Sequence, residues 1–521
     1  MGTRVGVFGW GIVAPKSPNI ETFADNLESC ESWLTPFNGF GPDNFLVGTP
    51  EFRFADYRSW IDARFPPRRF VQLEQKMDSP SQYAIGAFIQ ALGQNQGLEA
   101  ELQRLEGQAH VYIGMGLGNI GTIASAGLTL DRAQRTWDRF WSNPVRNSEL
   151  HRYLTGESLQ GTDIPINPAE VVENDRDAAE QKWHHYWAGR SPELASYLEE
   201  LAEIENVKVE GEVESGKMRA MREKDRLRTR LQQKWGAPDP PWLVSPDVIW
   251  NIHNTAAAQI SMISRITGFT FAPVAACSTF GVALRLALKA IQSGDAKAVV
   301  VGATDPPPHP LIVGAFYSAR VISANRRVSV PLTHLQGTHV SGGSVIWIVA
   351  DYDHMTALGF KPLGMQPLAV GVSSDAHHII TPSVEGPIAA IRQALTEARV
   401  QTGDVHTWDL HATATPGDYS EIKTFSTMFS RAVLITARKG TFGHGMSAGG
   451  GWELTAQYLG YERGHLFPTP IRRNDINSSI SDLHEAFVLE SSCEAPNGLA
   501  GKLSMGIGGI NACVISRPWD S

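Results

Sequence analysis

Short runs of β-branched and other apolar residues alternate along the chain with longer segments of helical periodicity. The apolar runs lie at residues 110–113, 298–301, 344–350 and 433–436, and the clearest helical segments at 82–92, 281–291 and 387–398. Continuous apolar runs of this length are typical of parallel strands that are buried on both faces. Strands alternating with helices predict an α/β fold whose sheets are covered by helices on both sides.

The first apolar run, residues 5–14, has the hydrophobicity of a signal-peptide core. It contains three glycines, follows a single Arg and precedes no small-x-small cleavage site. These features favour a buried first strand that ends in a glycine turn over a targeting segment. We therefore expect a soluble, cytoplasmic protein.

One long segment, from about residue 128 to 236, departs from the strand–helix alternation. It is polar, highly charged and rich in Trp, and it contains no strand-like run. Residues 195–204 have the acidic pattern of an amphipathic helix, residues 217–234 carry many Lys and Arg, and the Pro-rich residues 237–241 follow. The segment is predicted to be a mainly helical insertion. Its basic stretch is either a solvated helical face or a docking surface for an acidic partner.

Composition excludes several classes of protein. With 521 residues, 42% of them hydrophobic, the chain can bury a large core and is not intrinsically disordered. The formal net charge of −9 argues against general nucleic-acid binding. The four cysteines form no CxxC pair, so neither a disulfide scaffold nor a zinc knuckle is expected. No run of 18 apolar residues is present, so no membrane span is expected.

Two glycine-rich segments resemble the dinucleotide fingerprint GxGxxG. Residues 116–121 match it and residues 9–14 nearly do, but neither is followed at about twenty residues by a strand ending in an acidic residue. Both are predicted to be tight strand-to-helix turns rather than nicotinamide-binding loops.

Cys277 is the strongest candidate nucleophile. A β-like run ends at this residue, and the apolar-periodic segment 281–291 begins directly after it. A cysteine at a helix N-terminus meets free backbone N–H groups and the positive end of the helix dipole, both of which favour the thiolate. An inert buried cysteine is the alternative interpretation.

Two histidines occupy similar positions in the second half of the chain. His411 follows a short predicted strand, and His444 follows the predicted strand 432–437 in a Gly-rich context. Side chains at the ends of parallel strands are where α/β proteins build their sites. HxxxH and HExxH spacings are absent, so no metal site is expected.

Together these segments resemble the β-ketoacyl synthases, which are decarboxylating condensing enzymes of the thiolase superfamily. Residues 274–281 resemble the family's Ala-Cys-Ser/Thr-Ser turn, residues 373–378 its Ser-Ser-Asp-Ala-x-His segment, residues 411–415 its His-Gly-Thr-Gly-Thr motif and residues 506–511 its Gly-Phe-Gly-Gly-Thr-Asn loop. Lys439 and His444 keep the family's spacing. The resemblance runs from residue 4 to about 517, interrupted by the insertion.

The resemblance implies a Cys-His-His site. Cys277 would be the nucleophile, His411 and His444 would hold a malonyl thioester, and Lys439 would fix the charge and position of their surroundings. The oxyanion hole would consist of backbone N–H groups in two loops, and the other matching residues would support the site or bind substrate. The oxyanion hole and gating loop would comprise Cys277, Ile507 and Gly508, the supporting residues would be Glu453 and His378, and the substrate-binding residues would be Thr413, Thr415 and Phe316.

The resemblance also implies the fold, the reaction and the partners. The fold would be a duplicated thiolase-like αβαβα arrangement, with residues 1–365 carrying Cys277 and the insertion, and residues 366–521 carrying both histidines. The reaction would be decarboxylative Claisen condensation of an acyl-Cys intermediate with a malonyl thioester, yielding a 3-oxoacyl thioester. Substrates would arrive on acyl carrier protein or CoA, and no cofactor would be needed. A homodimer is expected, with a heterodimer containing a related ketosynthase-like subunit as the alternative.

Departures from the family pattern leave the substrate and two other functions open. Ala412 and Ala414 replace glycines beside His411, Ile507 replaces the gating phenylalanine, and the segment after Pro331 is altered. These changes motivate a non-decarboxylating acyltransferase as one alternative. A non-catalytic, chain-length-setting partner subunit is the second, although such subunits typically lack the nucleophile that is present here. A thiolase is disfavoured because Cys513 does not fall in a Cys-x-Gly loop.

Overall fold

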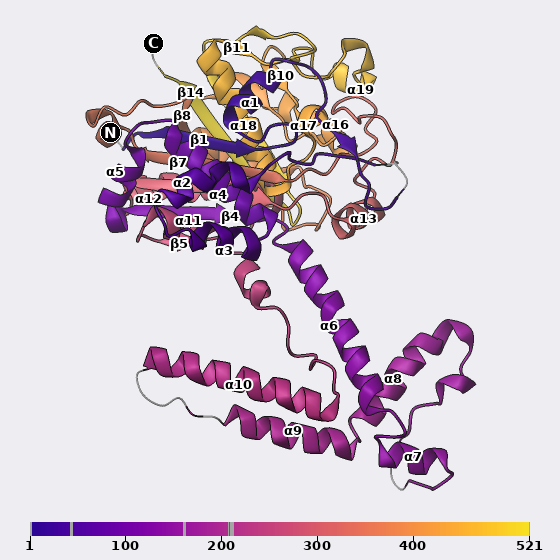
Figure 1. Ribbon diagram of the computed structural model, residues 1–521. Helices are drawn as coiled ribbons and strands as arrows, with labels where there is room; N and C mark the ends of the chain where they lie inside the picture. Colours follow the sequence, from indigo (N-terminus) through magenta and orange to yellow (C-terminus); the bar gives the residue numbers. More distant parts are fainter. Residues whose placement is uncertain (1–2, 42–44, 160–162, 207, 209–212, 520–521) are drawn as a thin grey trace. The chain divides into compact units, whose positions relative to one another are not determined.

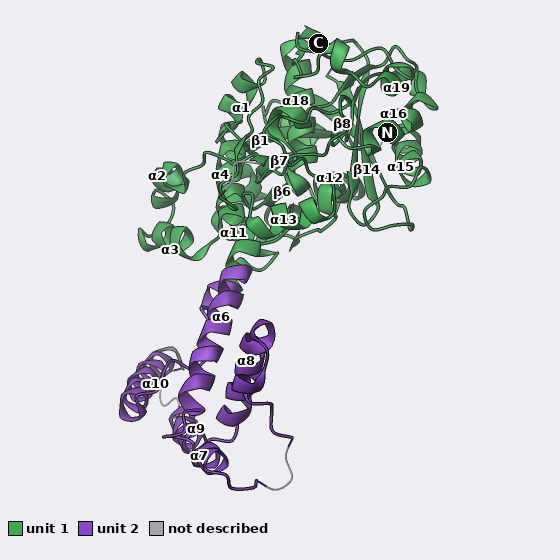
Figure 2. Cartoon of the chain, turned by 90° about the vertical axis from the view of Figure 1, so that its right-hand side faces the viewer, with its two compact units in different colours: residues 1–122, 249–521 green, residues 123–248 purple. Residues whose placement is uncertain are grey.

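The structure is a computed structural model that describes residues 3–41, 45–159, 163–206, 208 and 213–519 (Figure 1). Contacts divide the chain into unit 1, residues 1–122 and 249–521, and unit 2, residues 123–248 (Figure 2). Unit 2 begins five residues before the predicted insertion and ends twelve residues after it. Residues 160–162, 207 and 209–212 of that insertion lie outside the described residues.

Two five-stranded mixed sheets form the frame of unit 1. The first has the strand order β1 (Val5–Val13), β7 (Gly343–Asp351), β6 (Ala298–Asp305), β4 (Ala109–Gly114) and β5 (Thr270–Phe271). The second has the order β10 (Leu434–Thr436), β9 (Val405–Asp409), β13 (Leu499–Gly506), β14 (Ile510–Pro518) and β8 (Met365–Ser374). All strands of the second sheet follow residue 364. Two short ribbons, β2 (Thr35–Pro36) with β3 (Leu46–Val47) and β11 (His465–Leu466) with β12 (Cys493–Glu494), complete the pairing.

Helices enclose both sheets in five layers, α–β–α–β–α (Figure 1). The middle layer consists of α12 (Thr279–Ser293) and α18 (Met446–Arg463), which contact strands of both sheets. The outer face of the first sheet is covered by α4 (Ser79–Gly93) and α11 (Thr255–Ser264), and that of the second by α15 (Glu385–Ala398) and α16 (Gly417–Ser426). Smaller helices of unit 1 are α1 (Ile20–Asn26), α2 (Arg58–Asp62), α3 (Arg68–Lys76), α5 (Leu98–Arg104), α13 (Pro310–Ser318), α14 (Tyr352–Ala357), α17 (Lys439–Phe442) and α19 (Ser478–Ser481).

The apolar runs of the sequence are apolar because their strands are buried on both faces. Along β6, Val299 and Val301 pack into the middle layer, whereas Ala298 and Val300 pack against the outer helices. Alternate side chains of a strand point to opposite faces, so a strand between two helical layers needs apolar residues throughout. The predicted α/β class with covered sheets is therefore confirmed.

The orientation of one predicted strand is wrong. Residues 344–350 are expected to be a parallel strand, but β7 pairs antiparallel with both β1 and β6. The continuous apolar run reflects burial on both faces, and burial does not depend on strand direction. By contrast, β4 pairs parallel with β5 and β6, and β10 pairs parallel with β9.

The predicted turn at residues 9–14 is also wrong, because Gly9 and Gly11 lie within β1. A Cβ atom at Gly11 would lie 1.9 Å from the carbonyl oxygen of Ala87 in α4, and one at Gly9 would lie 2.3 Å from that of Ala91. These glycines therefore allow helix α4 to pack directly on the strand backbone. Residues 116–121 do form a strand-to-helix turn, between β4 and α6 (Ile120–Trp141).

We expect Gly11→Ala to destabilise unit 1 by about 1–3 kcal/mol, because the added methyl group must push the α4 backbone away from β1. Thermal unfolding should show a clearly lower transition midpoint. Gly121→Ala is the matched control, since a Cβ atom there would meet nothing within 4 Å in helix α6. Equal midpoints for the two variants would contradict close packing at Gly11.

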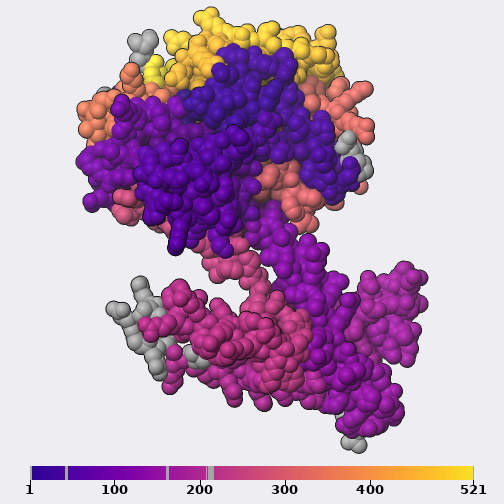
Figure 3. Space-filling view, viewed as in Figure 1, coloured from indigo at the N-terminus to yellow at the C-terminus, as the bar shows by residue number. Residues whose placement is uncertain are grey.

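Unit 2 is helical and has an aromatic core of its own. It contains most of α6 together with α7 (Ser148–Leu154), α8 (Arg176–Ala188), α9 (Pro192–Glu205) and α10 (Val213–Trp235). Trp137, Trp141 and Tyr197 pack in one apolar cluster, and Trp183 and Trp187 in another. The tryptophans that mark this segment in the sequence are therefore core residues. Exposed residues of α10 include the charged Arg219, Arg222 and Arg230. Figure 3 shows the molecular surface coloured by residue number.

Among helices in the described ranges, none combines the length and apolar character that a membrane crossing requires.

Candidate active site

Cys277 lies in a short 3₁₀ turn, Ala276–Ser278, directly before α12. Ala276 has φ of +48°, a left-handed conformation that bends the chain sharply ahead of the cysteine. The hydroxyl of Ser278 lies 2.7 Å from the carbonyl oxygen of Ile510 and 3.1 Å from that of Ser504. The turn is thereby fixed between the helix layer of the first half and strands β13 and β14 of the second.

The structure does not show the expected stabilisation of the Cys277 thiolate. Cys277 is only 6% exposed, and burial raises the pKa of its thiol to about 11. Hydrogen bonding from the backbone of Ile507, the positive charge of Lys439 and the backbone N–H of Cys277 itself oppose that rise. The desolvation cost of a buried anion exceeds these favourable contributions.

Backbone donors therefore converge on the Cys277 sulfur. Ile507 lies in the tight turn between β13 and β14, where Gly508 and Gly509 have φ of +91° and +72°. The N–H of Gly508 donates to the carbonyl of Ile379 at 2.7 Å, which holds this turn against the neighbouring loop. Ile507 is 38% exposed, so its side chain lies at the surface of the site.

His411 and His444 face each other in the same cavity. Their ring centroids are 5.4 Å apart and their planes cross at 81°. His411 follows β9 by two residues, and its N–H donates to Oε1 of Glu421 at 2.8 Å. His444 follows α17, and its N–H donates to the carbonyl of His339 at 2.7 Å. Both rings are thus held by their backbones at the ends of separate elements.

Both histidines are neutral at physiological pH. Burial lowers the pKa of His411 well below its ordinary value, and the positive charges of Lys439 and other nearby groups lower it further. Burial and then Lys439 and Lys502 lower the pKa of His444 in the same way. Because these pKa values lie below the usual range, the rings stay neutral as the pH falls through 6.5.

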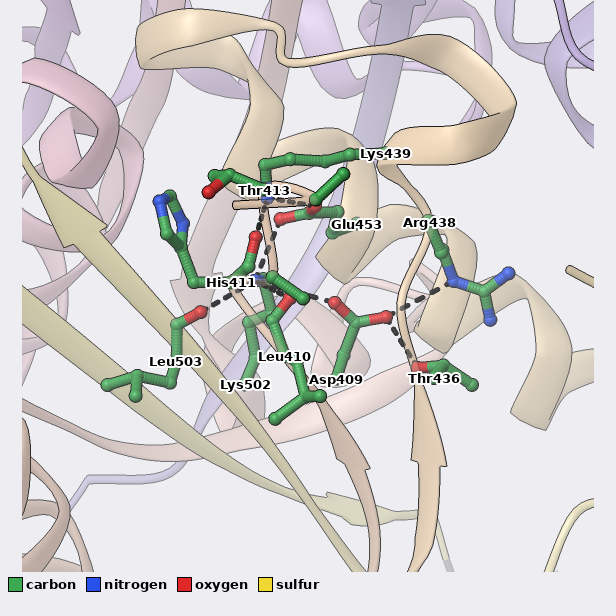
Figure 4. Close-up of polar contacts among 12 residues, drawn as sticks. Asp409, Leu410, His411, Thr413, Thr436, Arg438, Lys439, Glu453, Lys502 and Leu503 are labelled. Carbon is green, nitrogen blue, oxygen red and sulfur yellow. Dashed lines mark hydrogen bonds and ion pairs between the residues drawn. The ribbon is translucent and has the colours of Figure 1, made fainter. Parts of the chain in front are cut away.

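Lys439 connects the histidine loop to α18. Its ammonium donates to the carbonyl oxygen of His411 and lies 2.6 Å from Oε1 of Glu453 (Figure 4). Both side chains are almost fully buried. The predicted support of Lys439 by Glu453 is present in the structure as this buried ion pair.

The residues predicted to bind substrate line a cavity of about 120 Å³ together with Cys277 and both histidines. The hydroxyls of Thr413 and Thr415 lie 2.9 Å apart, and Phe316 comes from α13. The lining residues include Cys277, Phe316, Thr338, His411, Ala412, Thr413, Thr415, His444, Met505 and Ile507.

His378 is not brought to this cavity. It is exposed, and its Nδ1 accepts hydrogen bonds from the N–H groups of Ile380 and Thr381 at 3.1 and 3.0 Å. It closes a local turn in the loop that braces the Gly508 turn. His378 therefore matches the motif and precedes Ile379, which contacts the Gly508 turn, but its own side chain is exposed at the surface.

Three buried acidic residues that no motif indicates accept hydrogen bonds from backbone N–H groups of the site. The carboxylate of Asp418 accepts from the N–H groups of Thr413 and Leu332, and Glu421 from those of His411 and Ala412. Burial raises the pKa of Asp418 to about 6 and that of Glu421 to about 7. Asp305 accepts from the N–H groups of Gly116 and Leu117, so the glycine-rich turn binds a side chain of the protein. Asp409 is also buried, but its carboxylate contacts side chains and accepts from the hydroxyl of Thr436 at 2.6 Å.

Lys502 and Arg438 were also missed, and each contacts Asp409. Nζ of Lys502 lies 3.4 Å from Oδ1 of Asp409, and Nε of Arg438 lies 3.2 Å from Oδ2. Lys502 also lies 2.7 Å from Oε2 of Glu453 (Figure 4). A single lysine within the apolar strand segment 499–504 was the available signal, because a charged residue inside a buried strand requires a partner.

The sequence of this chain matches models of a known protein family. The family model "Beta-ketoacyl synthase, N-terminal domain" matches residues 220–353, and "Beta-ketoacyl synthase, C-terminal domain" matches residues 368–471. "3-oxoacyl-[acyl-carrier-protein] synthase 2" of Staphylococcus aureus is 25% identical over 288 residues, 52% of this chain and 66% of the relative. "Nodulation protein E" of Rhizobium meliloti is 28% identical over 220 residues, 42% of this chain and 54% of the relative. The alignments thus span less than two thirds of either relative.

Solved structures share the whole architecture at low identity. "The ishigamide ketosynthase/chain length factor" superposes with a TM-score of 0.68 and 17% identity, covering all of both chains. A structure of a "type II PKS acyl-carrier protein in complex with its ketosynthase bound to the hexaketide" gives 0.67 and 17%, covering 99% of this chain and all of the other. The fold is therefore thiolase-like, of the ketosynthase type. The chain belongs to the β-ketoacyl synthase family.

Proposed function

We propose that this protein is a 3-oxoacyl thioester synthase that condenses an acyl group on Cys277 with a malonyl thioester, in fatty-acid or polyketide-type biosynthesis. One observation carries the proposal: two buried, neutral histidines line the same cavity as the cysteine of a strained turn. Membership of the β-ketoacyl synthase family supports it. A condensing synthase of this kind is an acyltransferase in the broad sense, because it transfers an acyl group from Cys277 to carbon. It differs from the non-decarboxylating acyltransferase, which is the alternative function.

In the first half-reaction, the sulfur of Cys277 attacks the acyl thioester carbonyl. The carbon–sulfur bond to the carrier breaks, and the Cys277 proton ends on the departing carrier thiol. Negative charge on the carbonyl oxygen is stabilised by the backbone N–H groups of Cys277 and Ile507, both of which lie within hydrogen-bonding reach of this sulfur. Each such donor contributes about 3–4 kcal/mol to transition-state stabilisation.

In the second half-reaction, His411 and His444 donate Nε2–H hydrogen bonds to the malonyl thioester carbonyl. The bond to the carboxylate breaks, CO2 leaves, and the electron pair forms an enolate that both donors stabilise. The enolate carbon attacks the acyl-Cys277 carbonyl, a carbon–carbon bond forms, and the bond to the Cys277 sulfur breaks. The Cys277 thiolate then takes a proton from solvent, which replaces the one that left with the carrier thiol. No step requires a metal or redox cofactor.

The carrier and the assembly are part of the same proposal. Thr413 and Thr415 would contact the pantetheine arm of acyl carrier protein or CoA, because their hydroxyls line the cavity beside His411. A homodimer is the expected assembly. A heterodimer with a related ketosynthase-like subunit is the alternative, and the similarity to a ketosynthase/chain length factor supports retaining it.

Product analysis tests the proposal directly. Purified protein is incubated with an acyl-carrier or acyl-CoA primer and a malonyl thioester, and the carrier-bound products are weighed by mass spectrometry. A 3-oxoacyl thioester extended by two carbons is expected. Primer transfer to an alcohol or amine, without extension, would instead support the non-decarboxylating acyltransferase.

The acyltransferase alternative rests on the backbone beside His411. Ala414 has φ of +57°, a conformation that favours glycine, and Ala412 is buried against the catalytic loop. The strain is held by Asp418, which accepts the N–H of Ala414 at 3.1 Å. His411 nevertheless keeps its hydrogen bond to Glu421 and its place in the cavity, which favours condensation.

The Lys and Arg residues of the basic helix α10 divide into those that pair with carboxylates and those that are exposed without an ion pair among the described residues. Lys224 and Arg228 pair with Glu205 of α9, Lys234 pairs with Glu200, and Arg226 with Glu223. The pairs with Glu205 and Glu200 join α10 to α9, whereas the Arg226–Glu223 pair lies within α10. Within the ranges described, no ion pair is found for the exposed cations Lys217, Arg219, Arg222 and Arg230. These four are the better candidates for contact with an acidic carrier.

Changing Lys217, Arg219, Arg222 and Arg230 together to Gln should raise the KM for a carrier-bound substrate by about 3- to 10-fold at low salt, because steering of an acidic partner would be lost. The effect should shrink at high ionic strength. Lys224→Gln with Arg228→Gln is the matched control, expected to lower the unfolding temperature of unit 2 instead. An unchanged KM at low salt would identify α10 as a solvated helical face.

A further inference from the structure

Lys502 is a second buried ammonium group beneath the histidine pair, and it is not part of the site as inferred from motifs. It lies in the middle of β13 and is 1% exposed. Its Nζ lies 2.7 Å from Oε2 of Glu453, 2.7 Å from the carbonyl oxygen of Leu503 and 3.2 Å from that of Leu410 (Figure 4). The contact with Leu410 ties this ammonium to the loop that carries His411.

Lys439 and Lys502 donate hydrogen bonds to the carbonyl groups of two consecutive residues. Lys439 donates to the carbonyl of His411, and Lys502 donates to that of Leu410, one residue earlier. Glu453 joins them, with one carboxylate oxygen on each ammonium. Two charged donors on adjacent peptide groups, held by one buried carboxylate, fix both the position and the tilt of the backbone from which the His411 ring projects.

We propose that Lys502 is a positioning residue that, through Glu453 and the carbonyl of Leu410, holds His411 in its catalytic orientation. The catalytic role of His411 is the malonyl-binding role assigned above, so the proposal rests on the proposed function. The positioning itself stands on the buried contacts.

The charge of Lys502 acts on both rings. Lys502 remains a cation, because its carboxylate partners raise its pKa despite burial. Its charge contributes to the lowered pKa of both His411 and His444. The other charged and titratable groups around it are Asp409 on β9, Glu453 on α18, Glu421 on α16, Cys513 on β14, Lys439 at the start of α17 and Arg438 directly before it. Removing Lys502 removes one positive charge and leaves Asp409 with Arg438 and Glu453 with Lys439.

Two neutral substitutions separate hydrogen bonding from charge. Lys502→Met removes both, whereas Lys502→Gln retains amide donors for the carbonyls of Leu410 and Leu503. We expect CO2 release from malonyl thioester at its optimum pH to fall about 10-fold in the Met variant and less in the Gln variant. In both variants the acid limb of the pH–rate profile should move upward, because the histidines protonate more easily. A purely structural role would lower the rate without moving that limb.

A chemical titration makes the test independent of turnover. Diethyl pyrocarbonate modifies neutral imidazole, so peptide mapping between pH 5 and 8 reports protonation of His411 and His444 separately. The pH at which modification slows should be higher in both variants than in the wild type, because the rings acquire protons more easily without the charge of Lys502. If wild-type protein releases no CO2, the proposed function fails while this titration still tests Lys502. Unchanged titration curves in both variants, with unchanged acid limbs, would overturn the proposal.

Discussion

Replacing Cys277 with alanine should abolish covalent loading of the protein by acyl thioesters. The sulfur of Cys277 lies near the backbone N–H groups of Ile507 and of Cys277 itself. Cys277 also lines the same cavity as both histidines. Intact-mass measurement after incubation with a panel of acyl-carrier and acyl-CoA substrates should show one added acyl group on wild-type protein and none on Cys277→Ala. The expected loss exceeds 100-fold, as for other groups that act directly in the chemistry.

The other cysteines serve as internal controls for this measurement. Cys30 and Cys493 are partly exposed, and Cys513 is fully buried in β14 among apolar side chains. None of the three lines the cavity. Cys30→Ala and Cys493→Ala should therefore load like wild type. Acyl groups that persist in Cys277→Ala, or that map to another cysteine, would remove the central claim of the proposed mechanism.

Much of the fold follows from the sequence because burial leaves a pattern. Segments 82–92, 281–291 and 387–398 lie within α4, α12 and α15, since the periodicity of a helix with one buried face is visible in any sequence. The direction of β7 could not be inferred, because a strand between two helical layers is apolar whichever way it runs. The sequence predicts a turn at Gly9 and Gly11 because close helix packing and turn formation both require glycine.

The candidate site also contains residues that local motifs predict and residues whose role depends on the folded arrangement. Cys277, His411, His444 and Lys439 follow from local motifs, and the structure brings all four within one connected arrangement. His378 also matches a motif, but the conformation of its loop turns the ring to the surface. Lys502 and Asp409 depend on contacts between β13, β9 and α18, which are distant in sequence. Such a buried charge network becomes visible only when the strands are placed side by side.

His411→Ala and His444→Ala should each lower CO2 release from malonyl thioester by at least about 100-fold, the usual scale for one positioned catalytic group. Both rings are neutral, so in the proposed reaction they act as hydrogen-bond donors to the enolate oxygen and not as bases. Glutamine also offers a neutral N–H donor. His411→Gln and His444→Gln should therefore retain more CO2 release than the alanine variants.

This comparison separates condensation from simple acyl transfer. Acyl transfer to an alcohol needs a general base, which glutamine cannot provide, so Gln and Ala would then be equally inactive. Labelled CO2 release from malonyl-carrier protein, with and without an acyl primer, is the measurement. His151→Ala changes an exposed histidine on α7 of unit 2 and should leave CO2 release unchanged, so it controls for losses of activity during purification. All four histidine variants should still acylate Cys277, because the donors of Cys277 and Ile507 remain. If the wild-type protein loads Cys277 but releases no CO2 from any malonyl thioester, the condensing assignment fails and the acyltransferase takes its place.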